Sequence, residues 1–433
     1  MLTRNILALV ATTALAAPHT PISARAATNS SYSLTTSYKG SSFFDNFSFY
    51  TGADPTNGFV NYTSRLTAAN TGLVGFIHNL TSNASTAYIG VDYNTTTSVA
   101  RNSVRLIGDK KFNAGSMAVI DVRHIPVQNG VWPAIWMLGA DGIWPSSGES
   151  DILEYVHTAE GNAVTLHTAP GFVVDNSTDA FQGSLVDSNC NAVDATKGCS
   201  ITMEHDTSNS SLATAGEAFN AQRGGVYVHD WTNDGITVWL FPRDQLPADL
   251  VAGHPDSATW TRKPLAKFTG KGDFGTTFKN MQLILNIDFC GDWAGKEEVW
   301  NNGPAKLTGA KTCAEYVGAN PLAFKESYFE IGSIDFYSAG APSYDAPSKR
   351  SLSEHDHDVK SHHHHGHHNH AVPTDSASQV QPSSTVDAPV KRSATTSDAS
   401  ATEVAGWLVA ADNTTIRTDS MSWLKEWNQA LWM

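Results

Sequence analysis

Charged side chains are scarce in this 433-residue chain, at 16% of all residues, and basic ones are the scarcest, with 28 Lys or Arg against 42 Asp or Glu. The resulting net charge of −14 argues against nucleic acid and anionic membrane surfaces as partners, because both bind through clustered basic side chains. We therefore expect no nucleic-acid partner. A neutral polymer is compatible with this composition and with its 12 tryptophans.

Long apolar runs are also missing. No segment reaches the roughly 18 apolar residues of a membrane span, so we expect none. The apolar stretch at residues 6–15 is too short to span, follows Arg4 and leads into the small residues Ala14 and Ala16. This pattern predicts a signal peptide over residues 1–16, with cleavage as late as residue 26 as the alternative.

Cysteine is rare as well, with four residues and no C-x-x-C pair, which argues against a zinc site. In a secreted chain two disulfides are the first expectation. We favour the local pairs, Cys190 with Cys199 and Cys290 with Cys313, over the long-range pairings. Secretion, to the medium or the cell wall, also fits the presence of nine N-x-[ST] sequons. These begin at Asn29, Asn46, Asn61, Asn79, Asn83, Asn94, Asn176, Asn209 and Asn413.

Residues 28–340 have the pattern of one all-β domain. Short apolar and β-branched runs, such as residues 117–122, 164–167 and 281–287, alternate with clusters of Gly, Asn, Asp and Pro. Residues 226–231 and 236–241 flank a segment ending in Asp234-Gly235, which predicts a hairpin. Many short strands without long helical stripes favour an antiparallel β-sandwich of the jelly-roll type.

Residues 341–433 differ sharply in composition. They are rich in His, Ser and Pro and poor in large apolar residues, so we expect a disordered, low-complexity tail. Residues 355–370 hold nine of the 17 histidines and are either a metal-binding tract or a solvated part of that tail. The apolar spacing of residues 421–432 predicts a short terminal helix.

Three carboxylates lie within six residues, at Glu149, Asp151 and Glu154. On a regular strand Glu149 and Asp151 share a face and Glu154 points away, because side chains alternate. A solvent-exposed polar strand is one explanation. The other is a β-bulge near Ile152 and Leu153, which turns Glu154 back to the face of Glu149. Two carboxyl groups about 5–5.5 Å apart are what glycoside hydrolysis with retention requires, one as nucleophile and one as acid/base.

With its surroundings, the run at residues 148–154 resembles the bulged E-x-D-x-x-E signature of glycoside hydrolase family 16. The similarity is greatest to the fungal endo-1,3(4)-β-glucanase, laminarinase-like branch, and covers roughly residues 32–338. It continues in the same order through residues 54–58, 101–105, 131–139, 165–168, 241–243 and 289–295. The resemblance implies a concanavalin-like jelly roll with a glycan cleft on its concave face.

The same resemblance implies Glu149 as nucleophile, Glu154 as general acid/base and Asp151 as their partner. It places His167 near the acid/base. It implies a substrate-binding set of Trp136, Trp144, His167, Arg105, Asn57 and Trp293. A core position for Trp136 and a structural role for Trp144 or Trp293 are the alternatives.

Five positions depart from the family pattern. Ser150 stands where an aliphatic residue is usual, Tyr155 where Gly is, and His157 where Asn is. Phe172 and the Asn129-Gly130 pair lack a usual Cys. We expect Ser150 to point away from the catalytic face. We also expect these positions to lie beside the cleft, where they would change substrate preference more than catalysis.

Three functions are consistent with these observations. The leading one is a secreted, monomeric endo-hydrolase that cleaves β-1,3- and mixed β-1,3/1,4-glucans with retention. The second is a cell-wall β-glucan transglycosylase on the same fold. The third, a non-catalytic glucan-binding protein, predicts loss of a catalytic carboxylate, and all three carboxylates are present. No residue set demands a metal ion or an organic cofactor.

Overall fold

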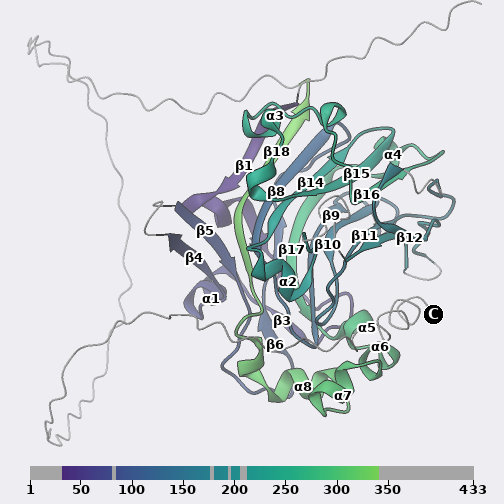
Figure 1. Cartoon of the computed structure of the whole chain (residues 1–433). Coiled ribbons are helices and arrows are strands. Elements are labelled where there is room, and N and C mark those ends of the chain that lie inside the picture. The colour runs from purple at the N-terminus through teal and green to yellow at the C-terminus, as the bar shows by residue number, and fades with distance from the viewer. Residues whose placement is uncertain (1–31, 80–83, 176–179, 194–196, 205–211, 341–433) are drawn as a thin grey trace, which may run out of the picture. The chain divides into compact units, whose positions relative to one another are not determined.

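The computed structural model describes residues 32–79, 84–175, 180–193, 197–204 and 212–340. The predicted signal peptide, the histidine-rich tail and the terminal helix lie outside these residues. Within these ranges, a pair of large sheets packs face to face (Figure 1). All pairings within the two sheets are antiparallel, so the predicted all-β sandwich is confirmed.

The first sheet has the order β16-β15-β14-β8-β18-β5-β4, with β1 also paired to β18. Its strands are β1 (Tyr32–Lys39), β4 (Val74–Asn79), β5 (Ala84–Ile89), β8 (Ser116–His124), β14 (Gly225–Trp231), β15 (Gly235–Phe241), β16 (Ala266–Thr269) and β18 (Phe329–Ala339). The hairpin predicted around Asp234-Gly235 is present, because β14 and β15 pair from Trp231 opposite Ile236 outward.

The second sheet has the order β12-β13-β11-β10-β9-β17-β7-β2 and carries the carboxylates near its middle, on β10. Its strands are β2 (Phe47–Phe49), β7 (Arg105–Gly108), β9 (Val131–Gly139), β10 (Glu149–Glu154), β11 (Asn162–His167), β12 (Ser184–Asp187), β13 (Cys199–Met203) and β17 (Met281–Phe289). A separate parallel pair joins β3 (Val60–Tyr62) to β6 (Arg101–Ser103).

Helices are short and lie in the connections between strands. The α-helices are α1 (Arg65–Asn70), α2 (Gly216–Ala221), α3 (Ala248–Val251), α4 (Phe274–Thr277), α5 (Gly291–Ala294), α6 (Glu297–Asn301), α7 (Pro304–Thr308) and α8 (Cys313–Ala319). The 3-10 helices are η1 (Gly40–Asn46), η3 (Arg243–Gln245), η4 (Ser257–Thr259) and η5 (Pro321–Phe324). No helix in the described ranges has the length and apolar character needed to cross a membrane.

Strand alternation explains which residues form the core. On β9, Val131, Ile135 and Met137 point into the space between the sheets and are buried. Ala134 and Trp136 point to the opposite face and form a separate small apolar cluster with Ile284 of β17. The second sheet therefore has one face committed to the core and one face available for a ligand.

Both predicted disulfides are confirmed. Cys190 pairs with Cys199 across nine residues, and Cys290 pairs with Cys313 across 23 residues. The second bond ties the end of β17 to the start of α8, so the four helices α5–α8 are held against the edge of the ligand face. These helices were not anticipated from the sequence.

Candidate active site

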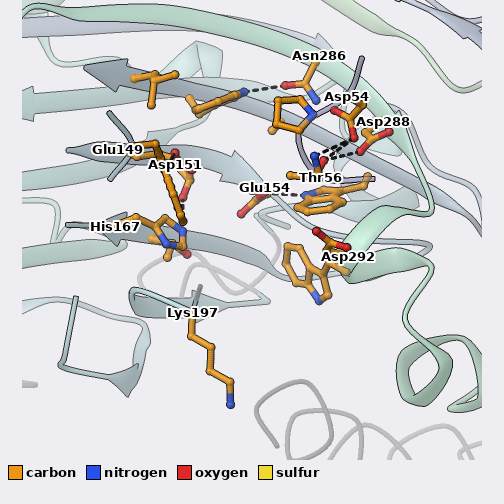
Figure 2. A pocket seen from close by; sticks show the side chains of 18 of the residues that line it. Asp54, Thr56, Glu149, Asp151, Glu154, His167, Lys197, Asn286, Asp288 and Asp292 are labelled. Atoms are coloured by element: carbon orange, nitrogen blue, oxygen red, sulfur yellow. Dashed lines mark hydrogen bonds and ion pairs between the residues drawn. The ribbon is translucent and has the colours of Figure 1, made fainter. Parts of the chain in front are cut away.

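Strand β10, which carries the three carboxylates, contains the predicted bulge. Opposite β9, Asp151 pairs with Trp136 but Leu153 pairs with Ile135, which leaves Ile152 as the extra residue. The register against β11 shifts between Asp151 and Glu154 as well. Because the bulge absorbs one residue, Glu149, Asp151 and Glu154 all line the same cleft (Figure 2).

The side chain of Asn162 stabilises the bulge. Its amide nitrogen donates to the carbonyl of Ile152 at 2.9 Å, and its amide oxygen accepts from the backbone N–H of Glu154 at 2.8 Å. A bulge leaves backbone groups without ladder partners, and these two bonds satisfy a carbonyl and an N–H there. Asn162 itself is buried at the start of β11.

The cleft has a volume of about 440 Å³ and crosses the exposed face of the second sheet. Its floor comes from β7, β9, β10, β11 and β17, and one end is bounded by the 54–56 segment and helices α5 and α6. Aromatic rings and carboxylates dominate the lining, a composition typical of a site for a neutral, hydroxyl-rich ligand.

Burial raises the pKa of all three carboxyl groups. It is the largest cause for each and raises the pKa of Glu149, Asp151 and Glu154 to about 8. The charge of Asp151 adds to the shift of both glutamates. The cluster therefore holds protons near neutral pH, as a site for proton transfer requires.

Each glutamate accepts a hydrogen bond from an indole. Trp144 Nε1 donates to Oε2 of Glu149 at 2.5 Å, and Trp132 Nε1 donates to Oε1 of Glu154 at 2.7 Å. Trp144 is 43% exposed on the loop before β10, so its side chain extends over the cleft rather than into the core. Both bonds favour the ionised carboxylate and oppose the effect of burial.

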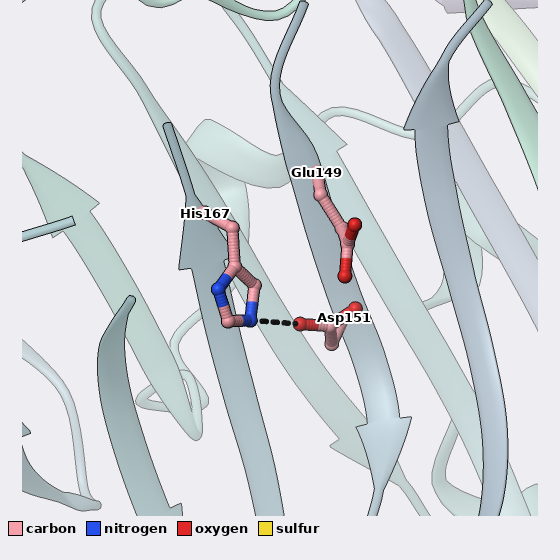
Figure 3. Close-up of side chains that lie close together, drawn as sticks. All are labelled: Glu149, Asp151 and His167. Atoms are coloured by element: carbon pink, nitrogen blue, oxygen red, sulfur yellow. Dashed lines mark ion pairs between the residues drawn. The ribbon is translucent and has the colours of Figure 1, made fainter. Parts of the chain in front are cut away.

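His167 lies directly opposite Glu149 in the β10–β11 pairing. Its Nε2 is 3.3 Å from Oδ2 of Asp151 (Figure 3). The resemblance had suggested a position near the acid/base. The ring contacts Asp151 and lowers the pKa of both Glu149 and Glu154, because β11 runs antiparallel to β10 and brings residue 167 level with residue 149.

One group of described residues could also hold a metal ion. It consists of Glu149, Asp151 and His167, whose ligand atoms all lie within 4.8 Å of one another. A cation there would have to displace protons, because burial raises the pKa of both carboxyl groups to about 8.

Trp136 combines the two roles considered for it. It is 9% exposed and therefore mostly buried, but it belongs to the cleft face and not to the core between the sheets. Its Nε1 donates to Asn286 at 2.7 Å, and the guanidinium of Arg105 lies 4.9 Å from its ring centre. Arg105 also stacks on Tyr50, so both predicted residues are held in the cleft floor.

At the α5 end of the cleft, Trp293 lines the cavity and packs edge-on against Trp132, with ring centres 5.6 Å apart. Asn57 does not line the cleft. Its amide instead donates to both carboxylate oxygens of Asp292, which does line it, at 3.1 and 3.0 Å. The sugar contact of Asn57 stays a prediction, and its amide contacts helix α5, which also carries Trp293.

Asp54 and Asp288 lie side by side at the same end (Figure 2). The Thr56 hydroxyl is 2.7 Å from Asp54 and 3.0 Å from Asp288. Burial, followed by the charge of Asp54, raises the pKa of Asp288 well above its usual value. Their shared contacts anchor the 54–58 segment against β17.

Several cleft residues were missed from the sequence: Trp132, Asp54, Asn286, Asp288 and Lys197. A signal existed for three of them. Trp132 lies four residues before Trp136, and Asn286 and Asp288 alternate along β17, so strand periodicity would have placed each pair on one face. Asp54 begins the 54–58 segment that carries the family resemblance, whereas no comparable signal marks Lys197, and both residues come from loops.

The departures from the family pattern lie in the interior and do not line the cleft within the described residues. Ser150 points away from the cleft as expected, and its hydroxyl lies 3.0 Å from Nε2 of His229 on the other sheet. Tyr155 is buried with its hydroxyl donating to Pro126, and Nδ1 of buried His157 accepts from the N–H of Gly130. The expectation that Tyr155 and His157 border the cleft was wrong, because the chain turns inward directly after Glu154.

Comparison with known proteins gives a consistent result. Residues 47–337 match a family model described as the XgeA-like, catalytic GH16 domain. A probable endo-1,3(4)-β-glucanase of Aspergillus clavatus is 40% identical over 319 residues, which is 72% of this chain and 47% of that protein. A probable glycosidase of Schizosaccharomyces pombe is 37% identical over 311 residues, or 71% of this chain and 69% of that one. The chain spans about half the length of the Aspergillus proteins that it matches.

Two solved structures are similar at 35% identity, and each is covered fully by 71% of this chain. One is an elongating GH family 16 β-1,3-glucosyltransferase, with a TM-score of 0.62. The other is the GH16 Laminarinase 16A of Phanerochaete chrysosporium, with β-glucans in its donor and acceptor sites and a TM-score of 0.63.

Proposed function

This chain belongs to glycoside hydrolase family 16, and on that basis we propose that it is a retaining endo-β-glucanase acting on β-1,3- and mixed β-1,3/1,4-glucans. The observation that carries the proposal is the bulged strand β10, which turns Glu149, Asp151 and Glu154 into one aromatic-lined cleft. Double-displacement hydrolysis of glycosides requires two carboxyl groups on one face of the cleft, one as nucleophile and one as acid/base.

In the first step an oxygen of ionised Glu149 attacks the anomeric carbon of the sugar beside it. The bond from that carbon to the glycosidic oxygen breaks, and the oxygen keeps the electron pair and takes the proton of Glu154. Burial and the charge of Asp151 raise the pKa of Glu149 to about 8, while His167 and the indole N–H of Trp144 lower it, so the attack uses the fraction of Glu149 that is ionised.

In the second step Glu154, now ionised, takes a proton from a water molecule. The water oxygen attacks the anomeric carbon and the bond to Glu149 breaks, which restores both carboxyl groups. Two inversions at one carbon give net retention. The pKa of Glu154, raised to about 8 mainly by burial, supports its role as an acid at neutral pH.

The assignment is tested with Glu149→Gln and Glu154→Ala on laminarin. We expect Glu149→Gln to lose nearly all activity, because the amide is a poor nucleophile. Glu154→Ala should cleave only aryl glucosides with good leaving groups, since these need no acid. Full activity of Glu149→Gln on laminarin would refute the nucleophile assignment. Parallel digestion of laminarin, lichenan, cellulose and galactan, with products sized and anomers followed by NMR, tests linkage preference and retention.

A transglycosylase is the second candidate. The similarity to an elongating β-1,3-glucosyltransferase at 35% identity favours it, and the same glycosyl-enzyme serves both reactions. If a sugar hydroxyl rather than water attacks in the second step, a defined laminari-oligosaccharide gives products longer than itself. Products that are only shorter would support hydrolysis.

We also propose that the protein is secreted, glycosylated and monomeric. Two disulfides, the sequons and the signal-like N-terminal pattern support secretion. Asn61 and Asn94 have exposed side chains among the described sequons and are the first candidates for glycans. Mass spectrometry of the purified protein before and after enzymatic deglycosylation, together with its mass in solution, tests these proposals.

A further inference from the structure

The two catalytic glutamates differ in how their indole partners are held. Each uses one oxygen to accept an indole N–H: Oε2 of Glu149 from Trp144, and Oε1 of Glu154 from Trp132. Among the described residues no hydrogen bond reaches the second oxygen of either carboxyl group, and both side chains line the cleft. One oxygen of each group is therefore left for the substrate.

Trp132 is fixed from several sides. It lies on β9, where its backbone pairs with Asp288 of β17, and its ring packs edge-on against Trp293. Gly291 leaves room for it, because a Cβ at that position would lie 3.2 Å from the Trp132 ring. Gly291 also has a φ of +61°, which other residues rarely adopt.

An indole nitrogen can donate a hydrogen bond but cannot accept one. The oxygen that it contacts must therefore be an acceptor: the carbonyl oxygen of a protonated carboxyl group, or either oxygen of a carboxylate. For Glu154 this leaves Oε2 as the oxygen that carries the proton. After proton transfer, the same N–H stabilises the negative charge on the carboxylate.

We propose that Trp132 is the positioning residue of the acid/base: by holding Oε1 of Glu154 it directs proton exchange to Oε2 and stabilises the ionised state between the two steps. This deepens the proposed function and rests on it. The proton of Oε2 passes to the glycosidic oxygen as the glycosidic bond breaks, and a proton of the attacking water returns to Oε2.

Other charged groups line the cleft beside Glu154, and two of them, Asp151 and His167, also shift its pKa, so a change in its titration must be separated from theirs. They are Glu149 and Asp151 on β10, His167 on β11, Asp288 on β17, and Asp292, Lys296 and Glu298 from α5, α6 and the segment between them. None of these is altered when Trp132 is replaced by another aromatic residue.

Trp144 provides a matched control at the other carboxylate. It also donates an indole N–H, but to the nucleophile and from a partly exposed loop. Loss of either N–H should raise the pKa of the glutamate that it contacts, because the bond favours the charged form. The acid limb of kcat/KM reports the nucleophile and the alkaline limb reports the acid, so the two variants should affect opposite limbs.

The test compares Trp132→Phe with Trp144→Phe on laminarin as a function of pH. For Trp132→Phe we expect the alkaline limb of kcat/KM to move up by about one pH unit while the acid limb stays in place. For Trp144→Phe we expect the acid limb to move up. An aryl glucoside with a good leaving group should lose less activity than laminarin in Trp132→Phe.

Replacement of Trp132 by benzothienylalanine, which keeps the ring shape and removes only the N–H, provides the same test if the phenylalanine variant folds poorly. Unmoved limbs in both Trp132 variants, or a uniform loss of activity at every pH, would overturn the proposal. Glu154→Ala distinguishes failure of the Trp132 proposal from failure of the proposed function. If it is inactive on laminarin while the Trp132 variants keep normal limbs, only the role of Trp132 fails.

Discussion

At the scale of single residues, Asp151 is the most enclosed of the three acids, with 2% of its surface exposed. Its Oδ2 is buried, accepts no hydrogen bond among the described residues, and lies 3.3 Å from Nε2 of His167. A buried carboxyl group with so few partners is costly to ionise, and burial accordingly raises its pKa to about 8. Asp151 therefore influences its neighbours mainly through its own protonation state.

Asp151→Asn tests that influence, because the amide keeps the shape and removes the charge. The charge of Asp151 raises the pKa of both Glu149 and Glu154, so its loss should lower both. Because Asp151 itself ionises only near pH 8, we expect mainly the alkaline limb of the pH profile of kcat/KM to move to lower pH, and the maximum to fall by about tenfold or more. A profile that keeps both limbs in place would show that Asp151 does not couple to the glutamates. The alkaline limb therefore moves in the direction opposite to that expected for Trp132→Phe.

At the scale of elements, the bulge in β10 depends on one side chain from the next strand. Asn162 bonds the Ile152 carbonyl with its nitrogen and the Glu154 N–H with its oxygen. Without these bonds two buried backbone groups lose their partners, at a cost of about 1–3 kcal/mol each. The position of Glu154 therefore depends on a residue that is not itself a candidate for catalysis.

Asn162→Ala should destabilise the protein by about 2–4 kcal/mol and reduce kcat more than it changes KM, because Glu154 loses its fixed position. Asn162→Asp is the matched control. It keeps an acceptor for the Glu154 N–H but loses the donor to Ile152, so its stability should fall between those of Ala and wild type. Urea unfolding and laminarin kinetics measure both effects. Wild-type stability in Asn162→Ala would contradict the role of Asn162.

The bulge also marks how far the sequence could predict the site. The odd spacing of Glu149 and Glu154 could be reconciled with one face only by an extra residue, and the extra residue is Ile152, within the predicted pair. Alternation on strands is local, so this prediction needed no knowledge of the fold. The local disulfides and the β14–β15 hairpin could be predicted for the same reason.

What failed depends on contacts between distant segments of the chain. His157 was expected at the cleft but packs inside against Gly130, which is 27 residues earlier. The sugar contact predicted for Asn57 stays a prediction, and its hydrogen bond to Asp292, which is 235 residues later, could likewise not be foreseen. Helices α5–α8 have five residues or fewer apart from α8, too short for a periodic apolar stripe to be recognised.

At the scale of the whole molecule, the sandwich divides its buried titratable groups into two kinds with opposite effects on stability. Burial lowers the pKa of His157 to about 3 and of His229 to about 4. These histidines take up protons on unfolding below about pH 6.5, so they destabilise the fold at acid pH, and this effect disappears as the pH rises to that value. The carboxyl groups of Glu149, Asp151 and Glu154 behave in the opposite way.

Because the folded pKa of Glu149, Asp151 and Glu154 is about 8 and the unfolded pKa is about 4, their stabilising contribution is fully present below about pH 4 and is lost as the pH rises through about 8. Above pH 7 the histidines no longer oppose this loss. We therefore expect the free energy of unfolding in urea to fall between pH 7 and pH 8.5, by about 1 kcal/mol per pH unit or more.

The control is the triple variant Glu149→Gln, Asp151→Asn, Glu154→Gln, which cannot titrate at these positions. In this variant the fall in unfolding free energy should be much smaller, with Asp288 accounting for some of what remains. An equal fall in both proteins would mean that the catalytic cluster does not hold its protons in the folded state.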